Sequence, residues 1–379
     1  MLVLGCGNIG SVAAEDLAKT TDYEIVVADN DLKRAENLAK RIGNSRVSAM
    51  RLDASDRRGS VRCLKGFDVV LGFLPGKLGY GLARACVEAG TDLVDVSFMA
   101  ENPLTLNDRA STAGVLIVPD CGLAPGISNV LVGHAAAALD RIDSVHVMVG
   151  GLPERPVPPL EYVITWSPES LIDEYTRNAR IIRGGKRVDA EVLSDLETID
   201  FPGVGRLEAF LTDGLRTLLD TLKDVPDMWE KTLRYPGHAA KIGALKGLGF
   251  FEDKEVAVGD IKFSPRKLTV KLLTDKLSRP KVCDIVAMKV EVSGVKNGKQ
   301  LSYVYHLLDR CDTEHGITAM ARTTAYPASI VAKLLAERAV KATGVIPPEK
   351  LGIDGKVYRL FCNELKTRGI KVIEELVKS

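Results

Sequence analysis

The first residues of the chain that could do chemistry lie in the hexapeptide GCGNIG, which begins at Gly5. Gly5 permits a tight turn out of a strand, Gly7 lets the backbone approach a pyrophosphate, and Gly10 lets a helix pack close to the strand. The N-terminus of that helix, at Asn8 and Ile9, would offer free N–H groups and a partial positive charge to the phosphates. This spacing predicts a loop that binds a dinucleotide.

A carboxylate stands about 20 residues beyond the loop, where the second strand of a dinucleotide-binding fold ends. Asp29 closes the run EIVVAD, and its oxygens can accept hydrogen bonds from the adenosine ribose and repel a 2′-phosphate. We therefore expect NAD rather than NADP, although Lys33 and Arg34 work against that preference. The alternative interpretation is a cluster of turn glycines followed by an aspartate that caps a helix.

Two further segments are candidates for contact with the cofactor. Asp53, in LDASD, follows the third expected strand and either touches the adenine edge or caps the next helix at Ser55–Asp56. Phe73, Leu74 and Pro75 follow the fourth expected strand, in a loop that faces the cofactor in this kind of fold. We expect the backbone of that loop to line the cofactor site.

The candidate catalytic groups begin with two aspartates at the carboxyl ends of expected strands, where open parallel sheets bind ligands. Asp95 follows the fifth strand and Asp120 the sixth. Hydride transfer from an amine requires the neutral amine, and a buried or paired carboxylate can position that amine or accept its proton. Both aspartates have the alternative role of capping a turn or helix. Cys121 either lines the nicotinamide pocket or is a small buried apolar residue.

A second group of candidates lies in the middle of the chain. His238 follows Arg234 in the segment RYPGH, and an Arg, a Tyr and a His close together can bind a carboxylate and shuttle a proton. Tyr175 and Arg180 belong to the charged segment WSPESLIDEYTRNARIIRGGK, which is either one wall of a substrate site or a solvated face. Because no CxxC pair occurs, we expect no structural zinc site and assign no metal.

The elements that must position these residues alternate between short apolar runs and amphipathic stretches over residues 1–120. We expect strands at 2–4, 24–28, 47–52, 69–73, 93–96 and 115–118, and helices at about 12–45, 56–64, 79–90 and 101–113. Apolar runs that alternate with helices indicate a parallel sheet covered on both faces. This part of the chain is therefore predicted to be a doubly wound α/β domain of the Rossmann type.

The pattern changes after Pro119. We expect a helix at 126–139, a strand at 142–149, and hairpins at 181–187 and 284–308, the latter around Asn297–Gly298. This predicts a second α+β domain with a largely antiparallel sheet over about 123–324. Residues 1–122 with about 325–379 would form the dinucleotide-binding domain, with two C-terminal helices that end near Ala342 and Val377.

The composition narrows the class of protein. Because 51 Lys and Arg balance 50 Asp and Glu, we expect neither nucleic acid nor an anionic membrane as partner. No apolar run is long enough to predict a transmembrane helix. Seven scattered cysteines without a signal-peptide pattern are interpreted as reduced thiols in a cytoplasmic protein. A small-molecule ligand suits this composition best.

Several longer motifs resemble those of a known family. The segments similar to saccharopine dehydrogenase-like proteins are GCGNIG, GFLPG, DLVDVSFM, VPDCGLAPGISN, SPESLIDEY, GRLEAFLTDG and TLRYPGH. Within that family they are most similar to the lysine 6-dehydrogenases. The resemblance covers nearly the whole chain, and the motifs beyond residue 119 are more specific than the glycine loop.

The resemblance implies a homodimer of two-domain subunits, with the active site between the domains and an amino acid as substrate. It implies NAD-dependent oxidation of the ε-amine carbon of L-lysine, release of ammonia, and cyclisation of the aldehyde to a piperideine carboxylate. It places the glycine loop on NAD, and Asp95, Asp120 and Cys121 beside the nicotinamide. Arg234 and His238 would bind the amino-acid end of the substrate or assist proton transfer.

Two other functions remain open on the sequence alone. A neighbouring enzyme would act on a secondary amine such as saccharopine or carboxynorspermidine, and the arginines of the second domain allow it. A non-catalytic NAD-binding sensor belongs to another class, and the charged residues of the expected cleft argue against it.

Overall fold

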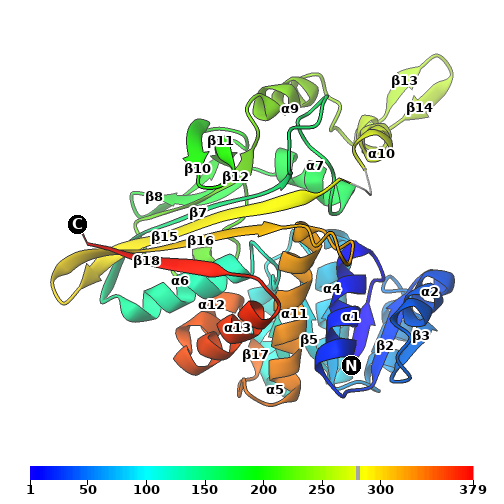
Figure 1. Cartoon of the computed structure of the whole chain (residues 1–379). Helices are drawn as coiled ribbons and strands as arrows, with labels where there is room; N and C mark the ends of the chain where they lie inside the picture. Colours follow the sequence, from blue (N-terminus) through cyan, green and yellow to red (C-terminus); the bar gives the residue numbers. More distant parts are fainter. Residues whose placement is uncertain (279–281, 379) are drawn as a thin grey trace. The chain divides into compact units, whose positions relative to one another are not determined.

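The computed structural model describes residues 1–278 and 282–378. By the contacts of its backbone the chain forms two compact units (Figure 1): unit 1 comprises Met1–Asp140 and Ala321–Lys371, and unit 2 comprises Arg141–Met320 and Val372–Ser379. Among the described residues, no helix is long and apolar enough to cross a lipid bilayer. The same residues contain no group of three or more His, Cys, Asp or Glu side chains that could hold a metal ion.

Unit 1 is built on a parallel sheet of seven strands in the order β17-β6-β5-β4-β1-β2-β3. The strands are β1 (Leu2–Leu4), β2 (Ile25–Asp29), β3 (Val47–Arg51), β4 (Val69–Gly72), β5 (Asp92–Asp95), β6 (Leu116–Val118) and β17 (Gly344–Val345). The first six follow the strand order of the doubly wound dinucleotide-binding fold. The fold predicted for this part of the chain is thus confirmed.

Helices connect the first six strands of unit 1. Four more helices of this unit come after β6 in the sequence: α6, α11, α12 and α13. The helices of unit 1, in chain order, are α1 (Asn8–Thr20), α2 (Leu32–Ile42), α3 (Arg57–Leu64), α4 (Gly76–Ala89), the 3-10 helix η1 (Pro103–Leu106), α5 (Asn107–Ala113), α6 (Ile127–Ala138), α11 (Ala319–Ala336), α12 (Pro348–Ile353) and α13 (Gly355–Thr367). The stretch expected to be helical at 12–45 contains two helices, because β2 interrupts it.

The C-terminal helices contact the first helix of the same unit. The buried carboxylate of Asp16 in α1 accepts hydrogen bonds from Arg368, at 2.8 and 3.0 Å from Nε, and from the hydroxyl of Ser329 in α11. α6 also lies in unit 1, where it packs against α12. The chain therefore passes from unit 1 to unit 2 at Asp140 and not near residue 123.

Unit 2 contains a mixed sheet in which the path of strands is β10-β11-β12-β7-β15-β16-β18, while β8 pairs with β12 and β9. Its strands are β7 (Arg141–Pro153), β8 (Ala179–Arg183), β9 (Lys186–Ala190), β10 (Glu197–Phe201), β11 (Gly205–Leu211), β12 (Asp227–Arg234), β15 (Asp284–Lys296), β16 (Lys299–Arg310) and β18 (Val372–Lys378). β7 and β12 are parallel and the other pairs are antiparallel. The largely antiparallel second domain is thus confirmed.

Helices and a separate hairpin complete unit 2. They are α7 (Pro168–Thr176), α8 (Leu218–Thr221), α9 (His238–Gly247), α10 (Pro265–Leu277) and the two-stranded pair β13 (Val256–Val258) with β14 (Ile261–Phe263). Both predicted hairpins form, as β8–β9 and β15–β16. Asn297 and Gly298 have φ of 50° and 75° at the tip of the second, the left-handed backbone that a tight hairpin turn requires.

The last segment of the chain is a strand, so the prediction of a final helix ending near Val377 is wrong. α13 ends at Thr367, and β18 then runs beside β16 in unit 2 (Figure 1). The apolar residues of this segment do have a spacing that suits one face of a helix: Val372, Ile373, Leu376 and Val377. The backbone N–H and C=O groups of this segment pair with the edge strand β16 and not within a helix. The local sequence pattern cannot reveal this pairing with a distant strand.

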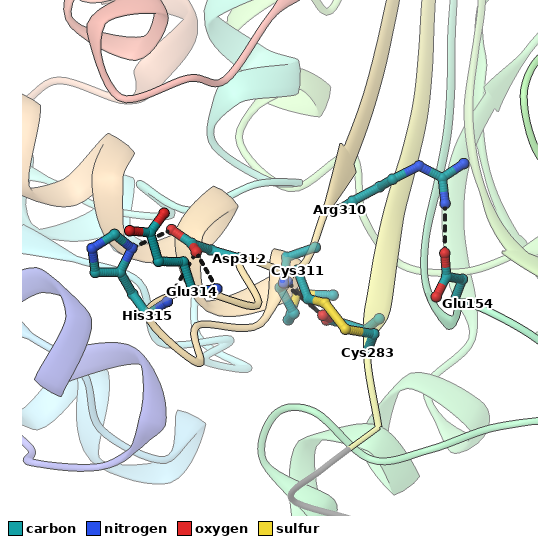
Figure 2. The surroundings of a disulfide bond; sticks show 10 residues. Glu154, Cys283, Arg310, Cys311, Asp312, Glu314 and His315 are labelled. Atoms are coloured by element: carbon teal, nitrogen blue, oxygen red, sulfur yellow. Dashed lines mark hydrogen bonds and ion pairs between the residues drawn. A yellow bond between two sulfur atoms is a disulfide. The ribbon is translucent and has the colours of Figure 1, made fainter.

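A disulfide joins Cys283 and Cys311, so these two cysteines are not the reduced thiols that the sequence analysis expects. The hairpin pairs Ile285 with Arg310 and thereby brings the residue before β15 close to the one after β16, at a Cα separation of 5.4 Å. Figure 2 shows the disulfide between the Arg310–Glu154 ion pair and the turn at Asp312. It therefore closes the open end of the longest hairpin.

Candidate active site

The loop after β1 has the geometry that its glycines predict. Gly5 has φ of 104°, and a Cβ on it would lie 2.4 Å from the carbonyl oxygen of Phe73. A Cβ on Gly10 would lie 1.9 Å from the carbonyl oxygen of Gly5, whereas a Cβ on Gly7 would meet nothing within 4 Å. Two glycines are thus required by close backbone contacts, and the third leaves open space at the start of α1.

The N-terminus of α1 suits a phosphate group. Its N-cap is Gly7, no side chain caps the helix, and no acidic residue lies in the first turn, which begins with Asn8 and Ile9. Uncapped N–H groups and the helix dipole favour an anion at such an end. Together with the open space at Gly7, these residues fit the pyrophosphate of a dinucleotide.

Asp29 is held next to this loop at the end of β2. Its Oδ2 accepts a hydrogen bond from the Cys6 N–H at 2.9 Å, and its Oδ1 accepts one from the Asp31 N–H at 3.0 Å. Burial, followed by the charge of Asp29, raises the pKa of the Cys6 thiol to about 12. The carboxylate is therefore fixed where an adenosine ribose would bind, with an Nη of the exposed Arg34 at 3.9 Å.

The other residues expected at the cofactor lie in loops after β3 and β4. Asp53 Oδ1 accepts hydrogen bonds from the N–H and the hydroxyl of Ser55, which lower the pKa of Asp53, while Asp56 caps α3. The Phe73 N–H donates to the carbonyl of Leu4 at 2.9 Å. The segment Phe73–Pro75 thereby lies beside the glycine loop, with Pro75 as the N-cap of α4.

Asp95, Asp120 and Cys121 come together at the carboxyl ends of β5 and β6. Asp95 is fully buried and accepts hydrogen bonds from the N–H and the hydroxyl of Ser97, both at 2.9 Å. A Cβ on Gly72 would lie 2.3 Å from Asp95 Oδ1, so this glycine makes room for the carboxylate. The Cys121 N–H donates to the Asp95 carbonyl at 2.8 Å. The two aspartates are thus neighbours at the ligand-binding edge of the sheet.

The turn after β6 presents these residues in a constrained backbone. Asp120 is buried and has φ of 53°, a conformation that aspartate tolerates better than most residues. A Cβ on Gly126 would lie 1.9 Å from the carbonyl oxygen of Gly122. The backbone at the two ends of the turn before α6 is therefore in close contact. Burial, followed by the charges of Asp95 and Asp120, raises the pKa of the Cys121 thiol, which argues against a reactive thiolate.

In unit 2, three of the predicted substrate or catalytic residues form one buried hydrogen-bonded chain. Arg234 Nε donates to the hydroxyl of Tyr175 at 3.2 Å, and that hydroxyl lies 2.8 Å from His238 Nε2. His238 Nδ1 lies 2.7 Å from the carbonyl of Leu160, which can only accept, so the ring proton is on Nδ1 and Tyr175 donates to Nε2. Burial, followed by the charge of Arg234, lowers the pKa of His238 to about 3. The imidazole is therefore neutral at ordinary pH.

The guanidinium of Arg234 is engaged on all three nitrogens within unit 2. Besides Tyr175, it donates from Nη1 to the carbonyl of Leu233 at 2.9 Å and from Nη2 to both Glu174 oxygens at 3.1 and 3.2 Å. The same group lies 4.7 Å from the ring centroid of Tyr162. Although each of its three nitrogens already donates within unit 2, a direct substrate contact by Arg234 stays a prediction.

Arg180 belongs to a different cluster of unit 2, whose members come from separate segments of the sequence. Its Nε and Nη2 each donate to Asp213 at 2.8 Å, and Nη1 of Arg177 lies 3.8 Å from the same carboxylate. Burial, followed by the charge of Arg216, lowers the pKa of Arg177. Arg177 therefore lies close to the guanidinium groups of Arg180 and Arg216 and to the buried carboxylate of Asp213.

Two family models match the chain in succession. Residues 1–118 match the saccharopine dehydrogenase NADP binding domain, and residues 122–370 match the saccharopine dehydrogenase C-terminal domain. In a solved structure, apo saccharopine dehydrogenase (L-Glu forming) from Saccharomyces cerevisiae, 99% of each chain is covered with a TM-score of 0.79 and 21% sequence identity. That likeness shows the same fold.

Curated relatives match at 23 to 27% identity. Carboxyaminopropylagmatine dehydrogenase from Synechocystis is 24% identical over 95% of this chain and 94% of its own length. The alpha-aminoadipic semialdehyde synthase of Arabidopsis thaliana is 24% identical over 99% of this chain, which spans 44% of that longer protein. The saccharopine dehydrogenase [NADP(+), L-glutamate-forming] of S. cerevisiae is 27% identical over 67% of this chain and 58% of its own length.

Proposed function

We propose that this chain, which belongs to the saccharopine dehydrogenase family, is an NAD-dependent dehydrogenase that oxidises the ε-amine carbon of L-lysine. The observation that carries the proposal is the pair of buried carboxylates Asp95 and Asp120 at neighbouring strand ends of unit 1. They lie at the edge where a doubly wound sheet binds its ligand, in the same unit as a glycine loop that fits a dinucleotide.

The proposed reaction needs a hydride acceptor and a group that takes a proton from the substrate ammonium. NAD, when bound, accepts the hydride from the carbon that carries the amine. Asp95 or Asp120 takes a proton from the substrate ammonium, which frees the nitrogen lone pair. Water then hydrolyses the imine, ammonia leaves, and the aldehyde cyclises to a piperideine carboxylate.

The choice of NAD rests on Asp29. Its carboxylate is fixed by two backbone N–H groups beside the glycine loop, where it would repel the 2′-phosphate of NADP. Against this stand the nearby Arg34 and the NADP named by the matching family model. Initial rates with NAD and NADP at equal concentration decide between them, and we expect NAD to be the better cofactor.

A secondary amine with an added carboxylate, such as saccharopine, is the second candidate substrate. Its added carboxylate needs further cationic partners, and unit 2 contains Arg177 and Arg180 beside Asp213. The names of the relatives point the same way. With purified protein and NAD, absorbance of the reduced cofactor is followed for L-lysine and for saccharopine. Turnover of saccharopine but not of lysine would replace the first candidate by the second.

Variants of the two aspartates test whether the chain is an enzyme at this site. Asp95→Asn and Asp120→Asn should each lower kcat by roughly 10²- to 10⁴-fold, because a group that accepts a proton is lost. Binding of NAD should persist, since the glycine loop is untouched. Asp108→Asn, at an exposed position of α5, is the matched control and should behave like the parent. Unchanged turnover in both test variants would place the chemistry elsewhere.

A further inference from the structure

Two buried threonines of unit 2 connect two glutamates through three short contacts. Thr212 Oγ1 lies 2.5 Å from Glu230 Oε2 and 2.8 Å from Thr232 Oγ1, which lies 2.7 Å from Glu174 Oε1. Glu230 is 4% exposed and both threonines are buried, whereas the Glu174 side chain is 13% exposed. The contacts therefore run from the interior of unit 2 to a carboxylate that reaches its surface.

The number of protons available fixes the charge of one glutamate. Each of the three oxygen–oxygen contacts requires one hydrogen, and the two hydroxyls supply two. The third hydrogen must be on a carboxyl group. Glu174 accepts two hydrogen bonds from Arg234 Nη2, so it is the ionised partner. Glu230 is therefore the neutral acid and donates to Thr212.

The surroundings of Glu230 agree with this count. Burial raises its pKa to about 8, with the charges of Glu174 and Asp213 acting in the same direction and the charge of Arg234 in the opposite one. A Cβ on Gly214 would lie 2.5 Å from Glu230 Oε2, so the absence of a side chain there leaves room for the carboxyl group. Glu230 thus holds its proton at neutral pH.

We propose that Glu230, Thr212, Thr232 and Glu174 form a proton relay that delivers a stored proton from the interior to Glu174. The O–H bond of Glu230 breaks as its proton binds Thr212, the Thr212 proton moves to Thr232, and the Thr232 proton binds Glu174. The net change is one proton moved from Glu230 to Glu174, and each threonine ends as it began. Glu230 is a positioning residue in this relay, since it acts through Glu174.

The relay deepens the proposed function and rests on it for its use. Glu174 lies in α7, which ends at Thr176, directly before Arg177 in the sequence. Loss of ammonia from a hydrolysing imine consumes a proton. Reloading of Glu230 by the reverse path uses the proton that oxidation releases.

Infrared spectroscopy tests the relay without substrate. The C=O stretch of a protonated carboxylic acid should be present at pH 7 and be lost in Glu230→Gln. On transfer into D2O the band should shift as the acid exchanges, and Thr212→Val and Thr232→Val should slow that exchange while Thr212→Ser restores it. Thr198→Val, at an exposed position of β10, is the matched control. A missing band, or exchange as fast in Thr212→Val as in the parent, overturns the relay.

Turnover gives a second measure that separates the relay from the proposed function. With an active substrate, Thr212→Val should lower kcat by roughly 10²-fold with KM unchanged, and Thr212→Ser should recover it. The pH profile of kcat should lose its inflection near pH 8 in Glu230→Gln. Absence of turnover with every amine tested would refute the proposed function, while the infrared exchange would still decide the relay.

Discussion

Burial sets the charge of single side chains in unit 2. His238 and Glu230 both lie in the interior, where a low dielectric disfavours the charged form of either group. The pKa of His238 falls to about 3 and that of Glu230 rises to about 8, so both are neutral at pH 7. Arg234, in contrast, forms an ion pair with Glu174, with 3.1 Å between Nη2 and Oε1. The neutral members of this network therefore lie in the interior, whereas its ion pair includes Glu174, whose side chain is 13% exposed.

The free energy of unfolding should depend on pH because Glu230 is a buried acid. The pKa of Glu230 is about 8 in the folded chain and near 4.5 when unfolded, so its contribution is complete below pH 4.5 and is lost as the pH rises through 8. Between about pH 5 and 8, the free energy of unfolding of the parent should fall relative to Glu230→Gln by roughly 1.4 kcal/mol per pH unit. Urea unfolding at a series of pH values measures the slope. If the free energy of unfolding had the same pH dependence in the parent and in Glu230→Gln, the prediction would be wrong. Glu255→Gln, at an exposed position, is the control.

Some site residues are visible in the sequence and others are not. The glycine loop and the two aspartates could be predicted because a strand end next to them positions each one. Glu230, Thr232 and Arg234 alternate along β12 and so share one face of the strand, a polar stripe of which only Arg234 was predicted as a site residue. Thr212 could not be predicted, since it meets this stripe through the pairing of β11 with β12.

At the scale of elements, two glycines let helices α6 and α12 of unit 1 approach each other. A Cβ on Gly133 would lie 2.0 Å from the carbonyl oxygen of Glu349, and a Cβ on Gly352 would lie 2.0 Å from that of Val130. The helices therefore touch backbone to backbone. Within the same crossing, the buried Glu349 accepts a hydrogen bond from the side chain of Asn129 at 3.1 Å.

Gly133→Ala should disrupt this crossing. The added methyl group has no space, because its neighbour is backbone, and we expect a loss of about 1 to 3 kcal/mol in the free energy of unfolding. Gly81→Ala in α4 is the matched control, since a Cβ there meets nothing within 4 Å and should raise stability slightly by favouring the helix. Thermal or urea unfolding of both variants provides the comparison. A Gly133→Ala protein as stable as the parent would rule out the tight crossing.

Elements with a strong local pattern could be predicted, and those set by distant pairing could not. The apolar runs of unit 1 and the Asn297–Gly298 hairpin each have a signal in neighbouring residues. β18 has apolar spacing that suits a helix, and only the unpaired edge of β16 makes it a strand. The same hairpin register could have revealed the disulfide, because it places Cys283 and Cys311 at matching ends.

At the scale of the whole molecule, the order of elements was enough to predict the fold class, because alternating strands and helices leave few topologies. The substrate is not determined in this way. It depends on side chains such as Arg177 and Asp213, which come from separate segments and meet only in the folded unit. The homodimer implied by the family resemblance stays a prediction, which sedimentation of the purified protein would test.

The disulfide should stabilise the molecule through its unfolded chain. In the folded state the paired strands β15 and β16 already hold Cys283 and Cys311 together, so reduction should leave the fold intact. In the unfolded state the bond closes a loop between residues 28 apart, which should cost roughly 3 to 4 kcal/mol in chain entropy. Reduction should therefore lower the urea midpoint of unit 2, and the double variant Cys283→Ser with Cys311→Ser should match the reduced parent.

The double variant also supplies the control for this prediction. Added reductant should not change its midpoint, because Cys6, Cys63, Cys86 and Cys121 form no disulfide in the described chain. Since the bond lies within unit 2, the loss should be confined to that unit, which the fluorescence of Trp166 and Trp229 reports. An unchanged midpoint on reduction would mean that the unfolded chain already keeps these cysteines close together. The stabilisation would then come from the hairpin alone.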